Sequence, residues 1–203
     1  MTEQKSGQYK TSRARERIVD AALTEFLASG YGATTIDGIV ARANASKATV
    51  YKHFSNKEEL LGIVIDKLVQ HHPAEDLNPH EAPEKALLDY AESRVKIVFA
   101  PRHNALRRLV IGEGARFPEM ARLYFKHGPG RSRRQLAKYF QQANRLGKMT
   151  VDDPENAADI FQGILMHALY QRTLYSVSKQ ISQKQLKLHA RMAVEKFLQL
   201  YRS

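Results

Sequence analysis

Donor-bearing side chains crowd one short stretch near the N-terminus. Between them stand small or apolar residues, Ala48, Val50 and Phe54, that can pack inward or against the methyl groups of bases. A helix that enters the major groove needs side chains that reach base edges from its N-terminal part, with donors beside them for phosphates. The stretch therefore predicts a DNA-reading helix whose donors are Lys47, Thr49, Tyr51, Lys52 and His53.

Catalytic and metal-binding chemistry have no comparable pattern. The sequence holds no nucleophile elbow, phosphate-binding loop or clustered pair of carboxylates, so we do not expect an enzyme. The chain has no cysteine, and its eight histidines show no His-x-x-x-His spacing. We therefore expect neither a metal site nor a cofactor.

Composition and charge agree with a DNA-binding protein of the cytoplasm. Hydrophobic residues make up 43% of the 203 residues and charged residues 26%, the balance of an ordinary globular protein. No apolar run approaches a membrane span and no secretory signal is visible, so no membrane partner is expected. The net charge of +11 favours a polyanionic partner. Residues 1–60 hold nine Lys and Arg against seven Asp and Glu, so bulk charge does not locate the DNA-binding part.

The elements that must position these donors are helices. Apolar residues recur with helical periodicity along the chain, and no window alternates as a strand would, so the predicted fold class is all-α. Three prolines make residues 71–83 resemble a linker. We expect a helix-turn-helix DNA-binding domain of three helices over residues 1–56 and a helical effector-binding and dimerisation domain over 57–203. The expected helices cover about 10–29, 36–43, 47–53, 57–70, 84–100, 103–116, 118–127, 131–147, 154–177 and 182–201.

Capping residues frame the two short helices. Gly30 suits the end of the first long helix, because glycine adopts the left-handed conformation without a Cβ penalty. Thr35 and Ser46 can each accept orphan backbone N–H groups at the start of a helix. Asn44 stands between them and is one of the few non-glycine residues tolerated at positive φ. Gly38, inside the first short helix, is expected to weaken it.

From Ile18 to Leu61 the sequence closely resembles the TetR family of transcription regulators. One departure is Asn44-Ala45, where members of that family usually have Gly-Val before the capping serine. The resemblance is carried by Ile18-Val19-Asp20-Ala21-Ala22, Phe26, Gly30-Tyr31, Thr34-Thr35-Ile36, Ile39, the run from Ala43 to Phe54 with its Tyr-x-His-Phe, and Lys57-Glu58-Glu59-Leu60-Leu61.

The resemblance assigns roles to individual positions. It implies that Lys47, Ala48 and Tyr51 face base edges. Arg13 and Arg17, early in the first helix, become candidates for flanking contacts to the DNA backbone. The residues that would hold phosphates are Thr35, Ser46, Thr49, His53 and Lys57.

The remaining two thirds resemble more loosely the C-terminal domains of efflux-associated members, through Ala115 to Ala121, Gly147, Asp153-Pro154 and Ala157-Ala158. The resemblance implies a homodimer that binds operator DNA and a small-molecule effector. The apolar stripes of the last two helices are the expected dimer interface, and the alternative is ordinary intramolecular core. That interface would comprise Phe161, Leu165, Leu169, Leu186, Val194, Phe197 and Tyr201.

An effector cavity is expected among the middle helices, again with ordinary core packing as the alternative for each residue. An excess of arginine there leaves open whether Arg107 or Arg116 turns inward, toward an anionic effector or Glu113, or faces solvent. The expected lining is Phe99, His103, Arg107, Phe117, Tyr124, Tyr139, Phe161, Leu165 and Tyr170.

The sequence thus predicts a transcriptional regulator, a repressor that an effector releases from a near-palindromic operator. Two other classes stay open. A ligand-independent architectural DNA binder would show little sequence preference and a steep salt dependence. A small-molecule binding protein or enzyme could retain the fold without using its DNA-reading part, although the intact stretch from Lys47 to His53 argues against it.

Overall fold

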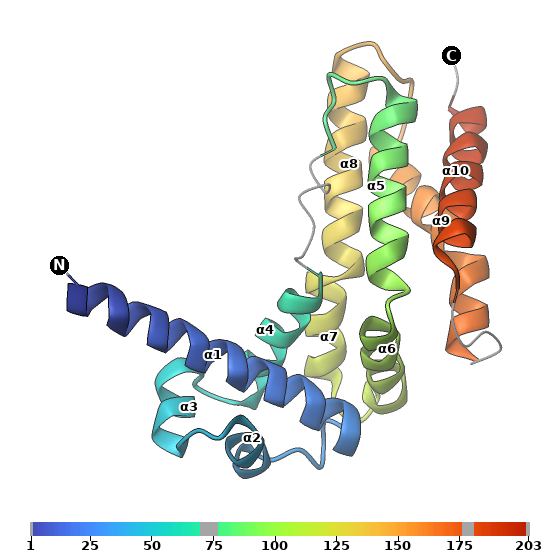
Figure 1. Cartoon of the computed structure of the whole chain (residues 1–203). Helices are drawn as coiled ribbons and strands as arrows, with labels where there is room; N and C mark the ends of the chain where they lie inside the picture. Colours follow the sequence, from blue (N-terminus) through green and yellow to red (C-terminus); the bar gives the residue numbers. More distant parts are fainter. Residues whose placement is uncertain (1, 70–76, 176–180, 202–203) are drawn as a thin grey trace. The chain divides into compact units, whose positions relative to one another are not determined.

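The computed structural model describes residues 2–69, 77–175 and 181–201 (Figure 1). Within these residues the regular structure is entirely helical, as predicted. None of these helices is both long enough and apolar enough to cross a membrane. The helices are α1 (Thr2–Ser29), α2 (Ile36–Ala43), α3 (Lys47–His53), α4 (Lys57–Val69), α5 (Pro83–Val98), α6 (Pro101–Glu113), α7 (Pro118–His127), α8 (Pro129–Arg145), α9 (Pro154–Leu174) and α10 (Gln183–Leu200).

Prolines set half of the described helix starts. Five consecutive helices, α5 to α9, open on a proline at their first position. Proline suits that position because its fixed φ is already helical and its missing N–H would have no partner there. The breaks expected at prolines are therefore confirmed. One expected start is wrong, because α1 begins at Thr2 rather than near residue 10. Its first turns are rich in Glu, Gln and Lys, which favour a helix without giving it an apolar face.

The chain divides into two compact units. The first unit combines Met1–Leu68 with Ala105–His127, and the second combines Val69–Asn104 with Gly128–Ser203. This division by packing differs from the expected boundary at residue 56, which remains a prediction about domains. The expected linker over residues 71–83 lies partly outside the described residues.

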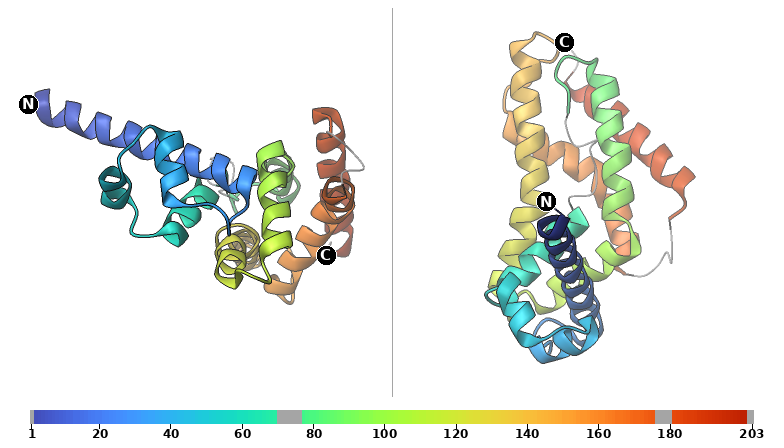
Figure 2. Two further views of the ribbon diagram at one scale, coloured as in Figure 1. Left: turned by 90° about the horizontal axis from the view of Figure 1, so that it is seen from below. Right: turned by 60° about the vertical axis from the view of Figure 1, so that its left-hand side comes forward.

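In the first unit, α1 runs across the two short helices α2 and α3 and packs against both (Figure 2). Phe26 of α1, Ile39 of α2 and Val50 of α3 are fully buried there. Each of the three helices thus contributes at least one fully buried apolar side chain to the packing of this unit. Leu60, Leu61 and Ile65 bury the inner face of α4 in the same unit.

In the second unit, α9 packs between α8 and α10, and α10 packs along α5. Phe197 of α10 lies at the centre of the core, with its ring centroid 5.2 Å from that of Phe140 and 4.9 Å from that of Phe161. Such aromatic contacts stabilise a core beyond the area they bury.

The residues of the expected dimer interface lie in or against the core of the single chain, and their part in a dimer remains a prediction. Six of the seven side chains are buried within a single chain, and the seventh, Tyr201, packs against that core. The apolar stripes of α9 and α10 pack against their own α5 and α8, which favours the alternative of intramolecular core for most of these residues. The six are Phe161, Leu165, Leu169, Leu186, Val194 and Phe197.

Candidate functional site

The turn between α2 and α3 has the geometry that its capping residues predict. Thr35 has extended backbone, and its Oγ1 accepts the Gly38 N–H at 3.1 Å, which starts α2. Asn44 ends α2 in the left-handed conformation, with φ 46° and ψ 54°. Ser46 then starts α3, where its Oγ accepts the Thr49 N–H at 3.1 Å. A capping residue thus stands at each start and end of this turn region, and the two helices form a helix-turn-helix.

The recognition helix α3 presents two different faces. Val50 is fully buried, and Phe54, which ends the helix, is 2% exposed. Tyr51 leaves 55% of its surface exposed, an unusual fraction for so large an aromatic residue. The residues of the exposed face recur at intervals of three and four positions, as residues on one side of a helix do. They are Lys47, Ala48, Tyr51 and Lys52.

The residues predicted to contact the DNA backbone differ in accessibility. Arg13 and Arg17 are exposed on α1, and Thr35 and Ser46 are exposed at their caps. Thr49 and His53 are half-buried.

Lys47 forms an exposed ion pair with Asp37 of α2, with Nζ 2.7 Å from Oδ1. The hydrogen bond to that carboxylate raises the pKa of the lysine. Lys47 is therefore a cation at any physiological pH.

Lys57 has a structural role that the resemblance did not imply. Its Nζ donates to the carbonyl oxygens of Tyr31 at 2.9 Å and Thr34 at 3.1 Å. It also lies 4.4 Å from the centre of the Tyr31 ring, within range of a cation–π interaction. The ammonium group of Lys57 therefore holds the loop before α2. Two of its three N–H groups are used in these bonds, so at most one remains to donate to a phosphate.

Sequence reasoning missed several residues that hold together helices α1 to α3, which we call the reading head (residues 2–54). Arg42 of α2 pairs with Glu25 of α1, Nε to Oε1 2.5 Å, and Arg15 of α1 lies 5.6 Å from the centre of the Phe54 ring. The opposite charges of Glu25 and Arg42 are visible in the sequence. Only the packing of α1 across α2 brings them together, so no local sequence pattern predicts this ion pair.

The predicted effector residues divide between the two units. Arg107, Phe117 and Tyr124 belong to the first, and the second holds Phe99, His103, Tyr139, Phe161, Leu165 and Tyr170. Arg107 is buried, whereas Arg116 is exposed and lies 5.3 Å from the centre of the Phe117 ring. Phe161 and Leu165 are fully enclosed in the core of the second unit.

Buried polar atoms in the second unit are a further feature of this region. Ser93 Oγ on α5 and Gln135 Oε1 and Tyr139 Oη on α8 are buried, and no described residue forms a hydrogen bond with them. Burial, with smaller effects of Glu84 and Glu81, raises the pKa of Tyr139 to about 12. The phenol is therefore neutral at physiological pH and can donate a hydrogen bond.

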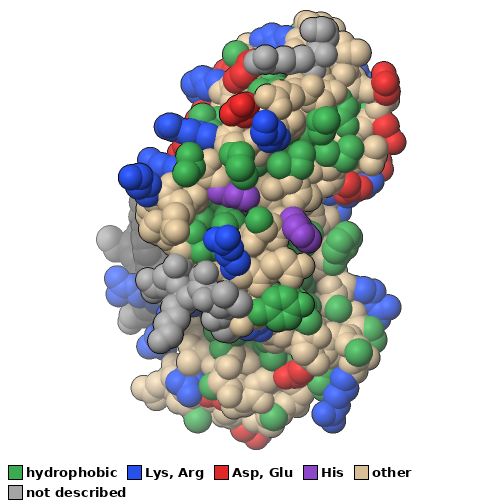
Figure 3. Space-filling model, turned by 90° about the vertical axis from the view of Figure 1, so that its right-hand side faces the viewer, with side chains coloured by type: hydrophobic (Ala, Val, Ile, Leu, Met, Phe, Trp, Pro, Cys, Tyr) green, Lys and Arg blue, Asp and Glu red, His purple; other side chains and the backbone are tan. Residues whose placement is uncertain are grey.

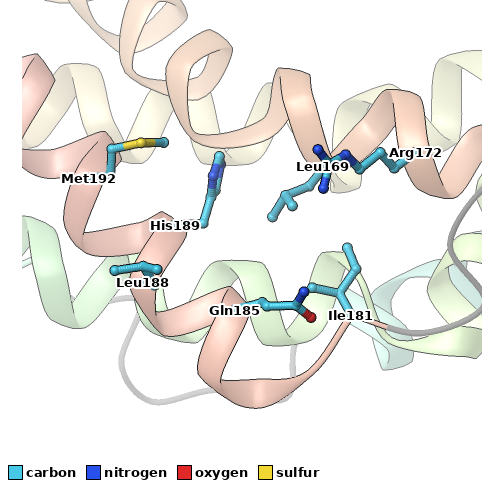
Figure 4. A pocket seen from close by; sticks show the side chains of 7 residues that line it. All are labelled: Leu169, Arg172, Ile181, Gln185, Leu188, His189 and Met192. Atoms are coloured by element: carbon cyan, nitrogen blue, oxygen red, sulfur yellow. The ribbon is translucent and has the colours of Figure 1, made fainter.

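A second exposed surface lies on α9 and α10. Leu188 is 68% exposed and Met192 is 46% exposed, one turn apart on α10. Hydrophobic side chains gather on the part of this face that the two helices form, with histidine among them (Figure 3). Between the helices is an open groove of about 230 Å³ (Figure 4). Its lining is Leu169, Arg172, Ile181, Gln185, Leu188, His189 and Met192.

Two family models match the chain. Residues 18–62 match the bacterial regulatory proteins of the tetR family, and residues 85–203 match the C-terminal domain of AefR-like transcriptional repressors. The HTH-type transcriptional regulator SrpR of Pseudomonas putida is 24% identical over 164 residues, which cover 80% of this chain and 76% of that protein.

Solved structures of TetR-family regulators also resemble this chain over nearly its whole length. A TetR-family transcriptional regulator from Mesorhizobium loti is 29% identical, with a TM-score of 0.81 over 94% of this chain and 98% of that one. The flavonoid-responsive regulator FrrA is 27% identical, with a TM-score of 0.76 over 95% of this chain and 100% of that one.

Proposed function

The chain belongs to the TetR family of bacterial transcription regulators, and from this premise we propose that it is a homodimeric repressor, which a small-molecule effector releases from a near-palindromic operator. The observation that carries the proposal is α3, whose exposed Lys47, Ala48, Tyr51 and Lys52 stand over buried Val50 and Phe54. Such a helix is held rigidly from behind and offers its donors to a major groove. The match to AefR-like repressors supports repression rather than activation.

DNA binding is tested with an operator selected from random oligonucleotides by the purified protein. Fluorescence anisotropy then compares the wild type with Tyr51→Ala and Lys52→Ala. We expect Tyr51→Ala to weaken specific binding by about 1–3 kcal/mol, because the ring faces base edges. Lys52→Ala should weaken binding to all sequences alike and reduce the salt dependence by about one counterion.

The matched control is Lys138→Ala, which removes an exposed lysine from α8 of the second unit. It should leave both affinity and salt slope unchanged. Binding that is indifferent to sequence and to Tyr51 would contradict specific reading and favour an architectural DNA binder.

The groove on α9 and α10 is the surface we propose for dimerisation. Exposed apolar side chains beside a groove mark protein–protein contacts. On α9 the exposed face includes Gly163 and Ala168, which are small enough for a partner helix to approach closely. A dimer also places two α3 helices on the two halves of a palindrome.

The test of this surface is the double variant with Leu188→Glu and Met192→Glu, examined by light scattering. Both side chains are exposed in the single chain, so folding should survive while the dimer dissociates. Leu146→Glu is the matched control, because this leucine is 44% exposed at the end of α8. A double variant that stays dimeric would locate the interface elsewhere.

The buried polar atoms of the second unit favour an effector that forms hydrogen bonds, and the resemblance to FrrA suggests a neutral aromatic molecule that carries hydroxyl groups. An unpaired buried polar atom costs free energy, and a hydroxyl of a bound molecule would satisfy it. Ser93, Gln135 and Tyr139 offer such atoms. FrrA, which resembles this chain along its length, is flavonoid-responsive, and flavonoids have this chemistry.

The effector is tested by thermal shift with a series of flavonoids and aromatic carboxylates. We expect flavonoids to raise the melting temperature, and Tyr139→Phe to reduce that shift because it removes one donor. Tyr175→Phe, at a tyrosine that is 70% exposed, is the control and should leave the shift unchanged. Stabilisation by carboxylates alone would contradict a neutral effector and favour the buried Arg107.

A further inference from the structure

The loop between α1 and α2, which we call the α1–α2 loop (residues 30–35), is held by the junction of α6 and α7. All of these residues belong to the first unit. The Gly32 N–H donates to Glu113 Oε2 at 3.0 Å, at the last residue of α6. The Tyr31 ring meets the Phe117 ring edge to face, with centroids 5.2 Å apart, just before α7 begins.

Two glycines make room for these side chains. A Cβ on Gly32 would lie 2.7 Å from Phe117 Cζ, closer than real Cβ contacts come. A Cβ on Gly30 would overlap Glu113 Oε1, and Gly30 also has φ +83°. The loop therefore fits closely over Glu113 and Phe117, and a larger residue at either glycine would disturb this fit.

The other side of the same loop is tied to the start of α4. Lys57 Nζ donates to the carbonyls of Tyr31 and Thr34, and the Tyr31 hydroxyl donates to Glu58 Oε1 at 3.0 Å. Burial, reinforced by Glu58, raises the pKa of Tyr31, so its hydroxyl stays a donor. The loop is thus fixed between α4 and the α6–α7 junction.

We propose that Glu113 and Phe117 are positioning residues that couple α6 to the DNA-reading helices through the α1–α2 loop. The loop ends at Thr35, the cap of α2, so a shift of the loop moves the start of α2 and with it the turn to α3. α6 is one continuous helix whose first residues belong to the second unit and whose last belong to the first. This inference rests on the proposed function, because it supplies the route by which an effector in the second unit alters DNA binding.

Hydrogen–deuterium exchange on the DNA-free, full-length protein is the first test. Glu113→Ala should speed exchange in residues 30–43 by about tenfold, the effect of losing one hydrogen bond to a charged group. Glu113→Gln keeps an oxygen that can accept the Gly32 N–H, so it should restore most of the protection. Glu119→Ala removes the same charge from the first turn of α7 and should leave exchange in the α1–α2 loop near that of the wild type.

Coupling between two sites is reciprocal, so DNA binding must also alter the junction of α6 and α7. With the selected operator bound, exchange in residues 111–117 should slow in the wild type and in Glu113→Gln but not in Glu113→Ala. Bound operator without any change at residues 111–117 would overturn the coupling and leave the proposed function intact. Absence of specific operator binding would overturn the proposed function, and the first test would still decide whether Glu113 positions the loop.

Discussion

Asn44 offers a clean test of how the turn between the two short helices is specified. Its φ of 46° and ψ of 54° make it the one non-glycine residue at positive φ among the described residues. The side chain is exposed, so substitution changes backbone strain and little else. The N–H groups of Asn44 and Ala45 donate to Ala41 O and Val40 O, which fixes this conformation against the end of α2.

The magnitude follows from the cost of a Cβ in this region. An ordinary L-residue in the left-handed conformation loses about 1–2 kcal/mol, and asparagine recovers part of it through local hydrogen bonds. Asn44→Ala should therefore destabilise the protein by about 1 kcal/mol. Asn44→Gly removes the strain but adds freedom to the unfolded chain, so its effect should stay within about 0.5 kcal/mol.

The assay is urea denaturation followed by circular dichroism, at one protein concentration because dimer stability depends on it. Gln141 provides the internal control, since it is exposed within α8, where alanine is more stable than glycine by about 1 kcal/mol. At Asn44 the order of alanine and glycine should reverse. The same order at both positions would refute the assignment of left-handed strain to this turn.

Three further predictions concern stability. Gly38→Ala should stabilise the reading head by about 0.5–1 kcal/mol in the same assay, because a Cβ there would only touch Thr35 Oγ1, at 3.5 Å, and Glu25 Oε2, at 3.6 Å. Phe197→Ala should destabilise the chain by about 3–5 kcal/mol, since its buried ring contacts three other aromatic rings, and a smaller loss would argue against a rigid core. Glu59 accepts the Ser55 N–H at 2.7 Å, which lowers its pKa, so its contribution is present at neutral pH and is lost as the pH falls through that lowered value. Glu59→Gln should accordingly flatten the acid side of a stability–pH profile, and an unchanged profile would show that this bond contributes nothing.

Local signals in the sequence were sufficient for the reading head. The caps Thr35 and Ser46 and the turn at Asn44 each act within four residues of their own position, and all three have the predicted geometry. Helix starts at prolines were predictable for the same reason. The periodic pattern of the second unit likewise gave its helices within about one turn, the usual uncertainty of a helix boundary.

The partner of an apolar helix face cannot be identified from local sequence, so the sequence left both a dimer interface and intramolecular core open for these stripes. Periodicity indicates that a helix has an apolar stripe but not whether its partner lies in the same chain. On α10 the stripe through Phe197 is buried against its own core, whereas Leu188 and Met192 lie off that stripe and stay exposed. The link from Gly32 to Glu113 spans 81 residues, and no pattern in the sequence joins them.

Lys47 and Lys57 show why charge at a helix start does not by itself identify a DNA contact. Lys47 pairs with Asp37 in the open, where an ion pair contributes little, so an acceptor on a base edge can replace the carboxylate at small cost. Lys57 holds the carbonyls of Tyr31 and Thr34, both largely buried residues. Turning it toward a phosphate would leave buried acceptors without a partner, at a cost of about 1–3 kcal/mol each. We therefore predict that Lys47 exchanges its partner for DNA, whereas Lys57 keeps its bonds to the loop before α2.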